Sequence, residues 1–259
     1  MVVTRKMPPM RGIMAVDAVG FSKNPSRPQP ELSAAIPQVL AEAFDRCDLS
    51  EVWSARRFEE GTGDGYLFGV PHEDVPCLLH PLLDTLQEVL EEHDERLRAR
   101  SRTLRLRLRV AVNMGAVPDD GGDPRDGIGT PTNDTFRLLD SRPIREVMAN
   151  SNPDVTLLGA IVSERVFQEA VVAGHTELHP DRFERVTAEV KDKAFAQPAY
   201  LYVPTPSRKA GGDEPDAEPP GRSAPPVASS MTSIHGNVGN SISGGTFTGN
   251  VQQSGGALS

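Results

Sequence analysis

The sequence has too few cysteines and too short apolar runs for a disulfide, zinc or membrane protein. Cys47 and Cys77 are the two cysteines in 259 residues, so neither a disulfide framework nor a structural zinc site is expected. No apolar run is long enough to span a bilayer, and no signal-peptide core follows Lys6. Positive charge is also in deficit, because 27 Lys and Arg face 36 Asp and Glu. We therefore expect a reduced, cytoplasmic protein with no nucleic-acid or membrane partner.

Charged residues are absent from the last part of the chain. After Arg222 there is no Asp, Glu, Lys or Arg. The composition changes near Pro204, and residues 205–230 are rich in Pro, Ala, Gly and Ser, which is typical of a flexible linker. We expect a folded domain over residues 8–204, this linker, and a Gly/Asn/Ser-rich segment over residues 231–259.

Apolar periodicity within residues 8–204 predicts an α+β domain. The segments with strand character are 12–16, 52–58, 66–70, 104–112, 154–159, 183–191 and 199–203. The segments with helical character are 32–44, 79–90, 133–148 and 164–170, the last capped by Ser163. Pro37 should kink or split the first helix. This order predicts a sandwich in which helices flank a mostly antiparallel sheet.

Two aspartates stand where carboxylates need partners. Asp17 directly follows the apolar run 12–16, and Asp64 lies in the turn between 52–58 and 66–70. If the first strand lies beside this hairpin, the two carboxylates face each other, and they repel unless a cation lies between them. Such oxygen ligands suit Mg²⁺ or Mn²⁺. The alternative for each aspartate taken alone is a turn-capping role.

The turn after Asp17 offers a second binding element. Gly20, Phe21 and Ser22 lead towards a helix, and the free backbone N–H groups of such a turn can receive phosphate oxygens. Glycine at position 20 permits a close approach of the backbone to a ligand. Paired metals beside a phosphate cradle indicate nucleotidyl or phosphoryl chemistry.

Five segments in the same order resemble the class III nucleotidyl cyclase family. They are 16–22 (VDAVGFS), 63–65 (GDG), 108–117 (LRVAVNMGAV), 133–138 (NDTFRL) and 190–193 (VKDK) with 199–203 (AYLYV). With its RLLDS segment, the chain looks most like the stand-alone cyclase-homology domains of actinobacteria. The resemblance implies a ferredoxin-like cyclase sandwich.

The resemblance also implies a metal site shared between two chains. Asp17, Asp64 and the Ala18 carbonyl would bind two divalent ions, Mg²⁺ or Mn²⁺. One ion would make the ribose 3′-hydroxyl of a nucleoside triphosphate more acidic, and the other would hold the triphosphate. A homodimer with two symmetric sites is then expected.

The resemblance assigns the remaining groups to the other chain of the dimer. Arg137 would stabilise charge on the α-phosphate, and Asn133, one helical turn earlier, would hold the ribose. Lys193, together with Lys191, would bind the terminal phosphates. The alternatives are an Arg137 ion pair with Asp134 or Asp140, and lysines that merely protect a sheet edge. The Arg105–Arg107–Arg109 alternation is expected on the solvated face of a strand.

Glu60 and Asp126 are the expected base-reading pair. Adenylate cyclases usually have Lys and Asp at these places, and guanylate cyclases usually have Glu and Cys. Ionised carboxylates only accept hydrogen bonds, so adenine N1 would face an acceptor, which is unfavourable. A guanine or pyrimidine base is therefore predicted over adenine. Two alternatives stay open: a protonated carboxylate, or a site that Glu60 marks as decayed.

The C-terminal segment repeats the triplet Gly-Asn-Val, at 236–238 and at 249–251. A stretch with β-branched residues, Asn and Gln but no charge suits a β-arch with Asn ladders. It resembles bacterial amyloid signalling motifs, which implies a partner protein with a matching motif. The alternative is a disordered tail.

Two functions compete. The first is a metal-dependent nucleotidyl cyclase that converts a nucleoside triphosphate to a 3′,5′-cyclic nucleotide and pyrophosphate in intracellular signalling, such as antiphage defence. The second is an inactive cyclase-fold module that binds nucleotide or dimerises and is recruited through its C-terminal segment. Retention of both aspartates with Asn133 and Arg137 favours the first, and the unusual Glu60 and Asp126 pair favours the second.

Overall fold

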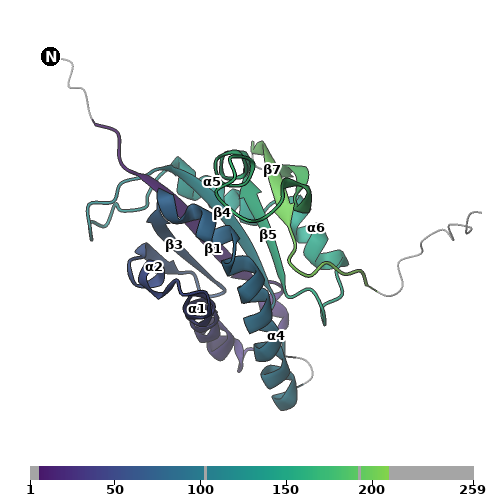
Figure 1. Ribbon diagram of the computed structural model, residues 1–259. Coiled ribbons are helices and arrows are strands. Elements are labelled where there is room, and N and C mark those ends of the chain that lie inside the picture. The colour runs from purple at the N-terminus through teal and green to yellow at the C-terminus, as the bar shows by residue number, and fades with distance from the viewer. Residues whose placement is uncertain (1–5, 102–103, 192–193, 210–259) are drawn as a thin grey trace, which may run out of the picture. The chain divides into compact units, whose positions relative to one another are not determined.

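The apolar run at 12–16 forms part of strand β1 (Met10–Ala18), near the centre of a seven-stranded sheet (Figure 1). The computed structural model describes residues 6–101, 104–191 and 194–209. The sheet order is β2-β3-β1-β4-β5-β7-β6. All strand pairs are antiparallel except β4 with β5. The other strands are β2 (Arg57–Gly61), β3 (Gly65–Pro71), β4 (Leu108–Ala116), β5 (Leu158–Ser163), β6 (Glu184–Glu189) and β7 (Ala196–Tyr202). The predicted α+β sandwich with a mostly antiparallel sheet is confirmed.

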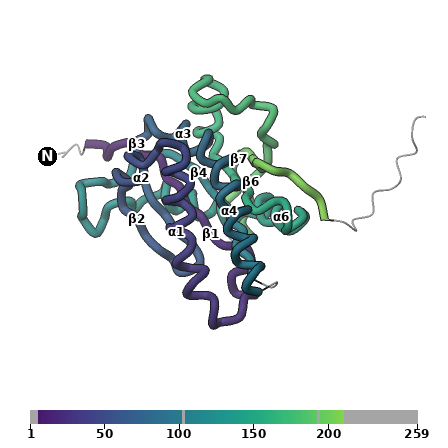
Figure 2. The backbone as a smooth tube through the Cα atoms, turned by 60° about the horizontal axis from the view of Figure 1, so that its bottom comes forward, coloured from purple at the N-terminus to yellow at the C-terminus, as the bar shows by residue number. Residues whose placement is uncertain are grey.

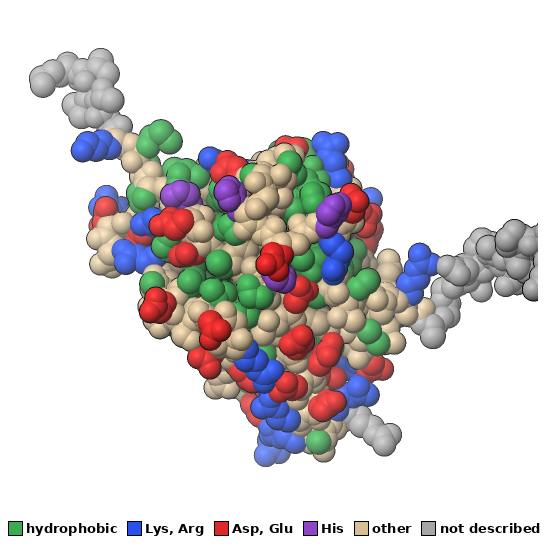
Figure 3. Space-filling view, viewed as in Figure 1, with side chains coloured by type: hydrophobic (Ala, Val, Ile, Leu, Met, Phe, Trp, Pro, Cys, Tyr) green, Lys and Arg blue, Asp and Glu red, His purple; other side chains and the backbone are tan. Residues whose placement is uncertain are grey.

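Two long helices cover one face of the sheet. Helices α1 (Gln29–Arg46) and α4 (Leu82–Arg100) lie side by side across it (Figures 1 and 2). Their apolar stripes pack on even-numbered residues of the central strands, such as Val16 and Val110. Figure 3 shows acidic and basic side chains interspersed over the outer surface of this layer. In the described part of the chain, no helix is long and apolar enough to cross a bilayer.

The opposite face of the sheet carries α5 (Thr130–Leu139) and α6 (Arg142–Asn150). Ala15, Leu67 and Ala111 form the apolar floor there, and Leu138 and Ile144 pack on it. Because side chains alternate along a strand, Asp17 lies on this same face, at the end of β1. The fold thus brings the first predicted aspartate to the face that α5 and α6 cover.

Several predicted element boundaries were wrong. Helix α1 runs through Pro37 without a split, because one lost backbone bond costs less than its buried face contributes. Residues 50–54 form helix α2 (Ser50–Ser54) rather than the start of a strand. The strands expected to start at 104 and 154 begin at 108 and 158.

The predicted helix 133–148 is two helices that break at Ser141. The Ser141 hydroxyl is buried and donates to the Leu138 carbonyl at 2.7 Å. Pro143 lies in the first turn of α6, where its missing N–H costs nothing. The break lets α6 turn towards β5 and β6.

Short elements complete the described chain. They are α3 (Val75–Leu79), α7 (Glu164–Val166), 3₁₀ turns at 21–23, 72–74 and 180–182, and a π-helical turn at 167–172. Ser163 caps α7 as predicted, because its hydroxyl accepts the Val166 N–H at 3.2 Å. The segment 231–259 and most of the linker lie outside the described residues.

Candidate functional site

The two predicted aspartates meet at the ends of neighbouring strands. Asp17 pairs with Gly65 across β1 and β3, and the Ala18 N–H donates to the Asp64 carbonyl at 2.8 Å. The Asp64 side chain is exposed, whereas that of Asp17 is mostly buried. The charge of Asp64 helps to raise the pKa of Asp17. The structure thus brings the two acidic residues together, as predicted from the sequence.

Arg109 neutralises Asp17 within the chain. It lies opposite Asp17 in the β1–β4 register, and its guanidinium donates to both carboxylate oxygens, with an Nε–Oδ1 distance of 2.8 Å. Burial raises the pKa of Asp17, and Arg109 opposes that rise. The prediction that Arg109 points into solvent was therefore wrong. Its side chain lies on the sheet face that α5 and α6 cover. The strand register that pairs it with Asp17 is not visible in the sequence.

A cavity of about 600 Å³ opens beside Asp64. The turn at Gly20, Phe21 and Ser22, which was predicted as a phosphate cradle, borders it together with Ala18. Gly20 has a φ of 68°, a left-handed conformation that suits glycine. We call this space the Asp64 cavity.

Cationic side chains from distant parts of the chain line the Asp64 cavity. They are Lys23, Arg107, Arg109, Arg145 and Lys209. Sequence reasoning assigned none of them to the site. Arg145 on α6 and Lys209 after β7 reach the cavity only through the fold. A cavity lined by charge of one sign concentrates ligands of the opposite sign.

The donor set beside this cavity suits a hard cation. Asp17, Asp64 and the Ala18 carbonyl are oxygen ligands of the kind that Mg²⁺ and Mn²⁺ prefer. Among the described residues, no group of three or more His, Cys, Asp or Glu side chains gathers for a metal. Because Arg109 holds both oxygens of Asp17, a cation must compete with it. The residues therefore fit a divalent ion in their chemistry, with Arg109 as the competitor.

Glu60 and Asp126 border one other cleft, of about 630 Å³, which we call the Glu60 cleft. The Asp126 carboxylate accepts backbone N–H bonds from Asp120 and Gly122, each at 2.8 Å, and from Asp123 at 3.0 Å. These bonds lower its pKa. These bonds favour the ionised form of Asp126, and its carboxylate organises its own loop. Glu60 is exposed at the cleft.

A β-bulge positions Glu60. The β2–β3 register shifts between Arg57 and Glu60, and Phe58 has a φ of 37°, rare for a residue with a side chain. A Cβ atom added at Gly69 or Gly127 would lie 2.0 or 2.5 Å from the Phe58 ring. The ring therefore lies directly against two glycine backbones beneath the cleft. Such strained positions often support functional sites.

Asn133 and Arg137 lie one turn apart on α5, away from both cavities. Asn133 is exposed, and neither residue lines the Asp64 cavity or the Glu60 cleft. Arg137 forms an ion pair with Asp134 at 2.8 Å, which is the alternative that the sequence left open. Its guanidinium also lies 5.6 Å from the Phe195 ring centroid. Within one chain, these two residues do not join the aspartates.

Of the two predicted phosphate-binding lysines, Lys191 is described, and it does not border the Asp64 cavity. Lys191 is exposed just after β6 and lines an adjoining cleft with Asp140, Arg142 and Arg145. Arg145 borders both spaces. Lys193 lies outside the described residues.

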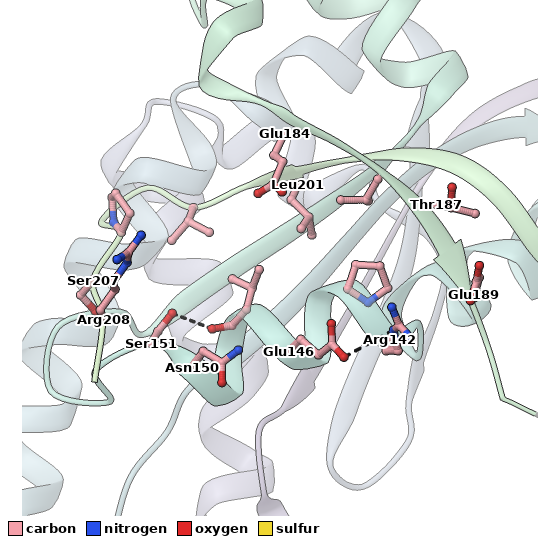
Figure 4. A pocket seen from close by; sticks show the side chains of 15 residues that line it. Arg142, Glu146, Asn150, Ser151, Glu184, Thr187, Glu189, Leu201, Ser207 and Arg208 are labelled. Carbon is pink, nitrogen blue, oxygen red and sulfur yellow. Dashed lines mark hydrogen bonds and ion pairs between the residues drawn. The ribbon is translucent and has the colours of Figure 1, made fainter. Parts of the chain in front are cut away.

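A further cleft, of about 640 Å³, lies between α6 and strands β6 and β7 (Figure 4). Arg142 and Glu146 line it from α6, and Ser207 and Arg208 line it from the segment after β7. None of the predicted site residues borders this cleft.

Solved structures with similar folds are nucleotidyl cyclases. An adenylate cyclase from Trypanosoma brucei in its monomeric state is 11% identical, with 78% of this chain and 91% of that chain covered at a TM-score of 0.50. The adenylyl cyclase CyaB from P. aeruginosa is 16% identical, with coverages of 78% and 97% and a TM-score of 0.47. The guanylyl cyclase Cya2 is 18% identical, with coverages of 75% and 90% and a TM-score of 0.46.

No protein-family model and no curated protein matches the chain. The trypanosomal comparison shows a shared fold, and its low identity assigns no activity to this chain.

Proposed function

We propose that this chain is a nucleotidyl cyclase, of the stand-alone type that its motifs resemble, which converts a nucleoside triphosphate to a 3′,5′-cyclic nucleotide and pyrophosphate. The observation that carries the proposal is that Asp17 lies next to Asp64 across neighbouring strands, and that Asp64 and the Gly20–Ser22 turn border a cavity lined by cations. Carboxylates for metals, backbone N–H groups for phosphate oxygens and positive charge for a triphosphate are what this reaction requires.

The reaction is a displacement within one substrate molecule. The ribose 3′-oxygen bonds to the α-phosphorus, the bond from the α-phosphorus to the bridging oxygen breaks, and pyrophosphate leaves. The 3′-hydroxyl proton passes to water. When bound by Asp17, Asp64 and the Ala18 carbonyl, a pair of Mg²⁺ or Mn²⁺ ions would make this hydroxyl more acidic and offset phosphate charge. The Gly20–Ser22 turn would orient the phosphates.

A homodimer completes the site in this proposal. Asn133 and Arg137 lie outside the Asp64 cavity of their own chain, so they would act at the site of the second chain. Twofold symmetry then gives two equal sites, each with aspartates from one chain and α5 from the other. Arg137 would leave Asp134 to offset charge on the α-phosphate, Asn133 would orient the ribose, and Lys191 and Lys193 would contact terminal phosphates.

Glu60 supports a preference for guanine or a pyrimidine over adenine. Because Asp126 is bound by its own loop, Glu60 is the carboxylate with freedom to meet a base at this cleft. An ionised carboxylate accepts hydrogen bonds and donates none. Guanine N1–H and N2–H₂ and the cytosine amino group supply the donors, whereas adenine N1 is an acceptor.

The C-terminal segment would recruit the enzyme. In this proposal, residues 231–259 assemble with a matching motif on a partner protein and concentrate the cyclase in intracellular signalling, such as antiphage defence. The test is the full chain incubated at high concentration with thioflavin T. Fluorescence that grows with time supports assembly, and a signal that stays at baseline rejects it.

One observation favours the competing function, an inactive module that binds nucleotide or dimerises. Arg109 holds both oxygens of Asp17, and Arg137 holds Asp134. If neither arginine releases its partner, the fold binds nucleotide without turning it over.

Mass spectrometry of the products from ATP, GTP, CTP and UTP with Mn²⁺ decides between the two functions. The proposal expects a cyclic nucleotide from wild-type protein, least from ATP, and none from Asp17→Ala or Arg137→Ala. Arg165→Ala is the control, because Arg165 on α7 forms an exposed ion pair with Glu169 in the turn that follows. No cyclic product from any nucleotide, or variants that turn over like the control, would overturn the enzyme proposal.

A further inference from the structure

Some of the cations that line the Asp64 cavity have no individual role in the proposed reaction. Arg107, Arg145 and Lys209 border it, yet none belongs to the residues given a role above. We propose that these three residues form a polyphosphate subsite supplied by the same chain as the aspartates, which holds the β- and γ-phosphates of the substrate and the pyrophosphate product. The identity of the substrate rests on the proposed function, whereas the binding of inorganic polyphosphate does not.

Arg107 borders the cavity as a mostly buried cation. The residue is 8% exposed, and its Nε donates to the Thr156 carbonyl at 2.9 Å. Its Nη2 is buried and finds no partner among the described residues. Asp94 and Asp154 are the carboxylates whose charges act on this guanidinium. Because the fold holds Arg107 in place, it adds fixed positive charge to the cavity wall, and the direct phosphate contacts fall to the exposed Arg145 and Lys209.

Thr156 links Arg107 to the segment after β7. Its fully buried hydroxyl donates to the Thr205 carbonyl at 2.6 Å and lies 2.7 Å from the Ser207 hydroxyl. The Lys209 N–H donates to the Asn150 carbonyl at 3.0 Å. We call residues 205–209 the strap. Because these bonds hold the strap against the loop after α6, the Lys209 side chain is kept at the cavity wall.

Lys209 has no ion-pair partner in the part of the chain that the structure describes, and neither does Lys23 across the turn. Arg145 on α6 pairs with Asp140, but 54% of its side chain is exposed. Asp64 is the acidic residue that lines this cavity together with Lys23, Arg145 and Lys209. The balance of charge therefore favours an anion with several negative charges over a single carboxylate.

The strap itself offers a matched control. Arg208, next to Lys209, lines the cleft between α6 and β6 instead (Figure 4). Arg142 on α6 likewise borders that cleft, and it forms its own ion pair with Glu146. Arg208 is thus the control for Lys209 in the strap, and Arg142 is the control for Arg145 on α6, because each pair loses the same charge from the same segment.

The test is calorimetric titration of the full chain with inorganic triphosphate in metal-free buffer. Lys209→Gln and Arg145→Gln are each expected to weaken binding about tenfold, the loss of one charge-assisted contact. Arg208→Gln and Arg142→Gln are expected to bind within about twofold of wild type. Lys209 and Arg145 are exposed, so the variants should fold, and a thermal melt verifies this.

The subsite is rejected if wild-type protein does not bind triphosphate, or if the four variants weaken binding equally. Binding that depends on Lys209 and Arg145 without any cyclic product leaves the subsite standing and rejects the reaction. Cyclic product with unchanged triphosphate affinity in Lys209→Gln and Arg145→Gln rejects the subsite and leaves the reaction standing.

Discussion

Asp17 depends on Arg109 for its charge. Both side chains are mostly buried, at 20% and 14% exposed, so removing the guanidinium leaves a carboxylate with little water around it. Arg109→Met is expected to reduce the free energy of unfolding by about 2–3 kcal/mol, measured by urea denaturation. The double variant Asp17→Asn with Arg109→Met should recover much of this loss, because no unpaired charge is left.

The control for this pair is Arg165→Met, which removes an exposed ion pair with Glu169 and should change stability by less than about 1 kcal/mol. A double variant that is as unstable as the sum of its single substitutions would show that the two side chains do not interact.

His93 on α4 predicts an acid-sensitive contact between α4 and α1. Its Nδ1 is buried without a partner among the described residues, and burial lowers its pKa, aided by Arg96 and opposed by Glu42, Glu31 and Asp94. The unfolded chain therefore binds this proton more tightly than the folded one. Above about pH 6.5 the histidine is neutral and the fold has its full stability. As the pH falls below that value, protonation favours the unfolded chain and stability is lost.

His93→Gln is expected to lessen this loss. Thermal unfolding of the full chain at about pH 7.5 and about pH 5.5 should show a smaller drop in melting temperature for the variant than for wild type. His72→Gln is the control, since its side chain is exposed. A drop equal to that of wild type would remove His93 as the cause.

At the scale of elements, the bulge in β2 fixes the wall of the Glu60 cleft. Gly69→Ala would place a methyl group 2.0 Å from the Phe58 ring, so we expect a loss of about 2 kcal/mol and a displaced β2. Gly61→Ala in the same hairpin meets no atom within 4 Å and should change stability by less than about 0.5 kcal/mol. Both are measured by urea unfolding.

Phe58→Ala in the Gly69→Ala background should restore part of the lost stability, since the methyl group then occupies space that the ring leaves. If Gly69→Ala is as stable as Gly61→Ala, the ring does not press on the strand.

Periodicity predicted the long elements well and the short ones poorly. The apolar spacing of α1 and α4 and the runs of β1 and β3 follow from burial on one face or two. The break at Ser141 and the turn of α2 depend on single hydrogen bonds and on packing against other elements. Propensity over a few residues is too weak to decide such cases.

At the scale of the whole molecule, the shared site makes a prediction about mixed chains. Asp17→Ala and Arg137→Ala protein are each expected to be inactive alone. Random exchange makes half of the dimers mixed, and each mixed dimer has one intact site of two, so the mixture should regain about one quarter of wild-type turnover. The measurement is cyclic nucleotide formed after the two chains are mixed.

Asp17→Ala mixed with Asp64→Ala is the control, because both substitutions fall on the same half of the site and no intact site can form. Activity in that control, or none in the first mixture, would contradict a site built from two chains.

The candidate site was predictable where its residues are close in sequence to a recognisable turn or strand end. Asp17 with Gly20–Ser22, and Asp64 with its hairpin, were found in this way. Arg145 and Lys209 were not, because α6 and the strap arrive at the cavity from positions about 130 to 190 residues downstream of Asp17. Contacts of that range depend on the completed sheet.

The strap makes the Asp64 cavity sensitive to mechanical force on the chain. A force applied to the chain after Lys209 acts first on the hydrogen bond from Lys209 to Asn150. It acts next on the bond from the Thr156 hydroxyl to Thr205. The carbonyl of Thr156 in turn accepts the Arg107 hydrogen bond. Traction would thus draw away one cation and loosen another while the strands stay paired. The cavity would then lose its affinity for phosphate at a lower force than the force that unfolds the domain.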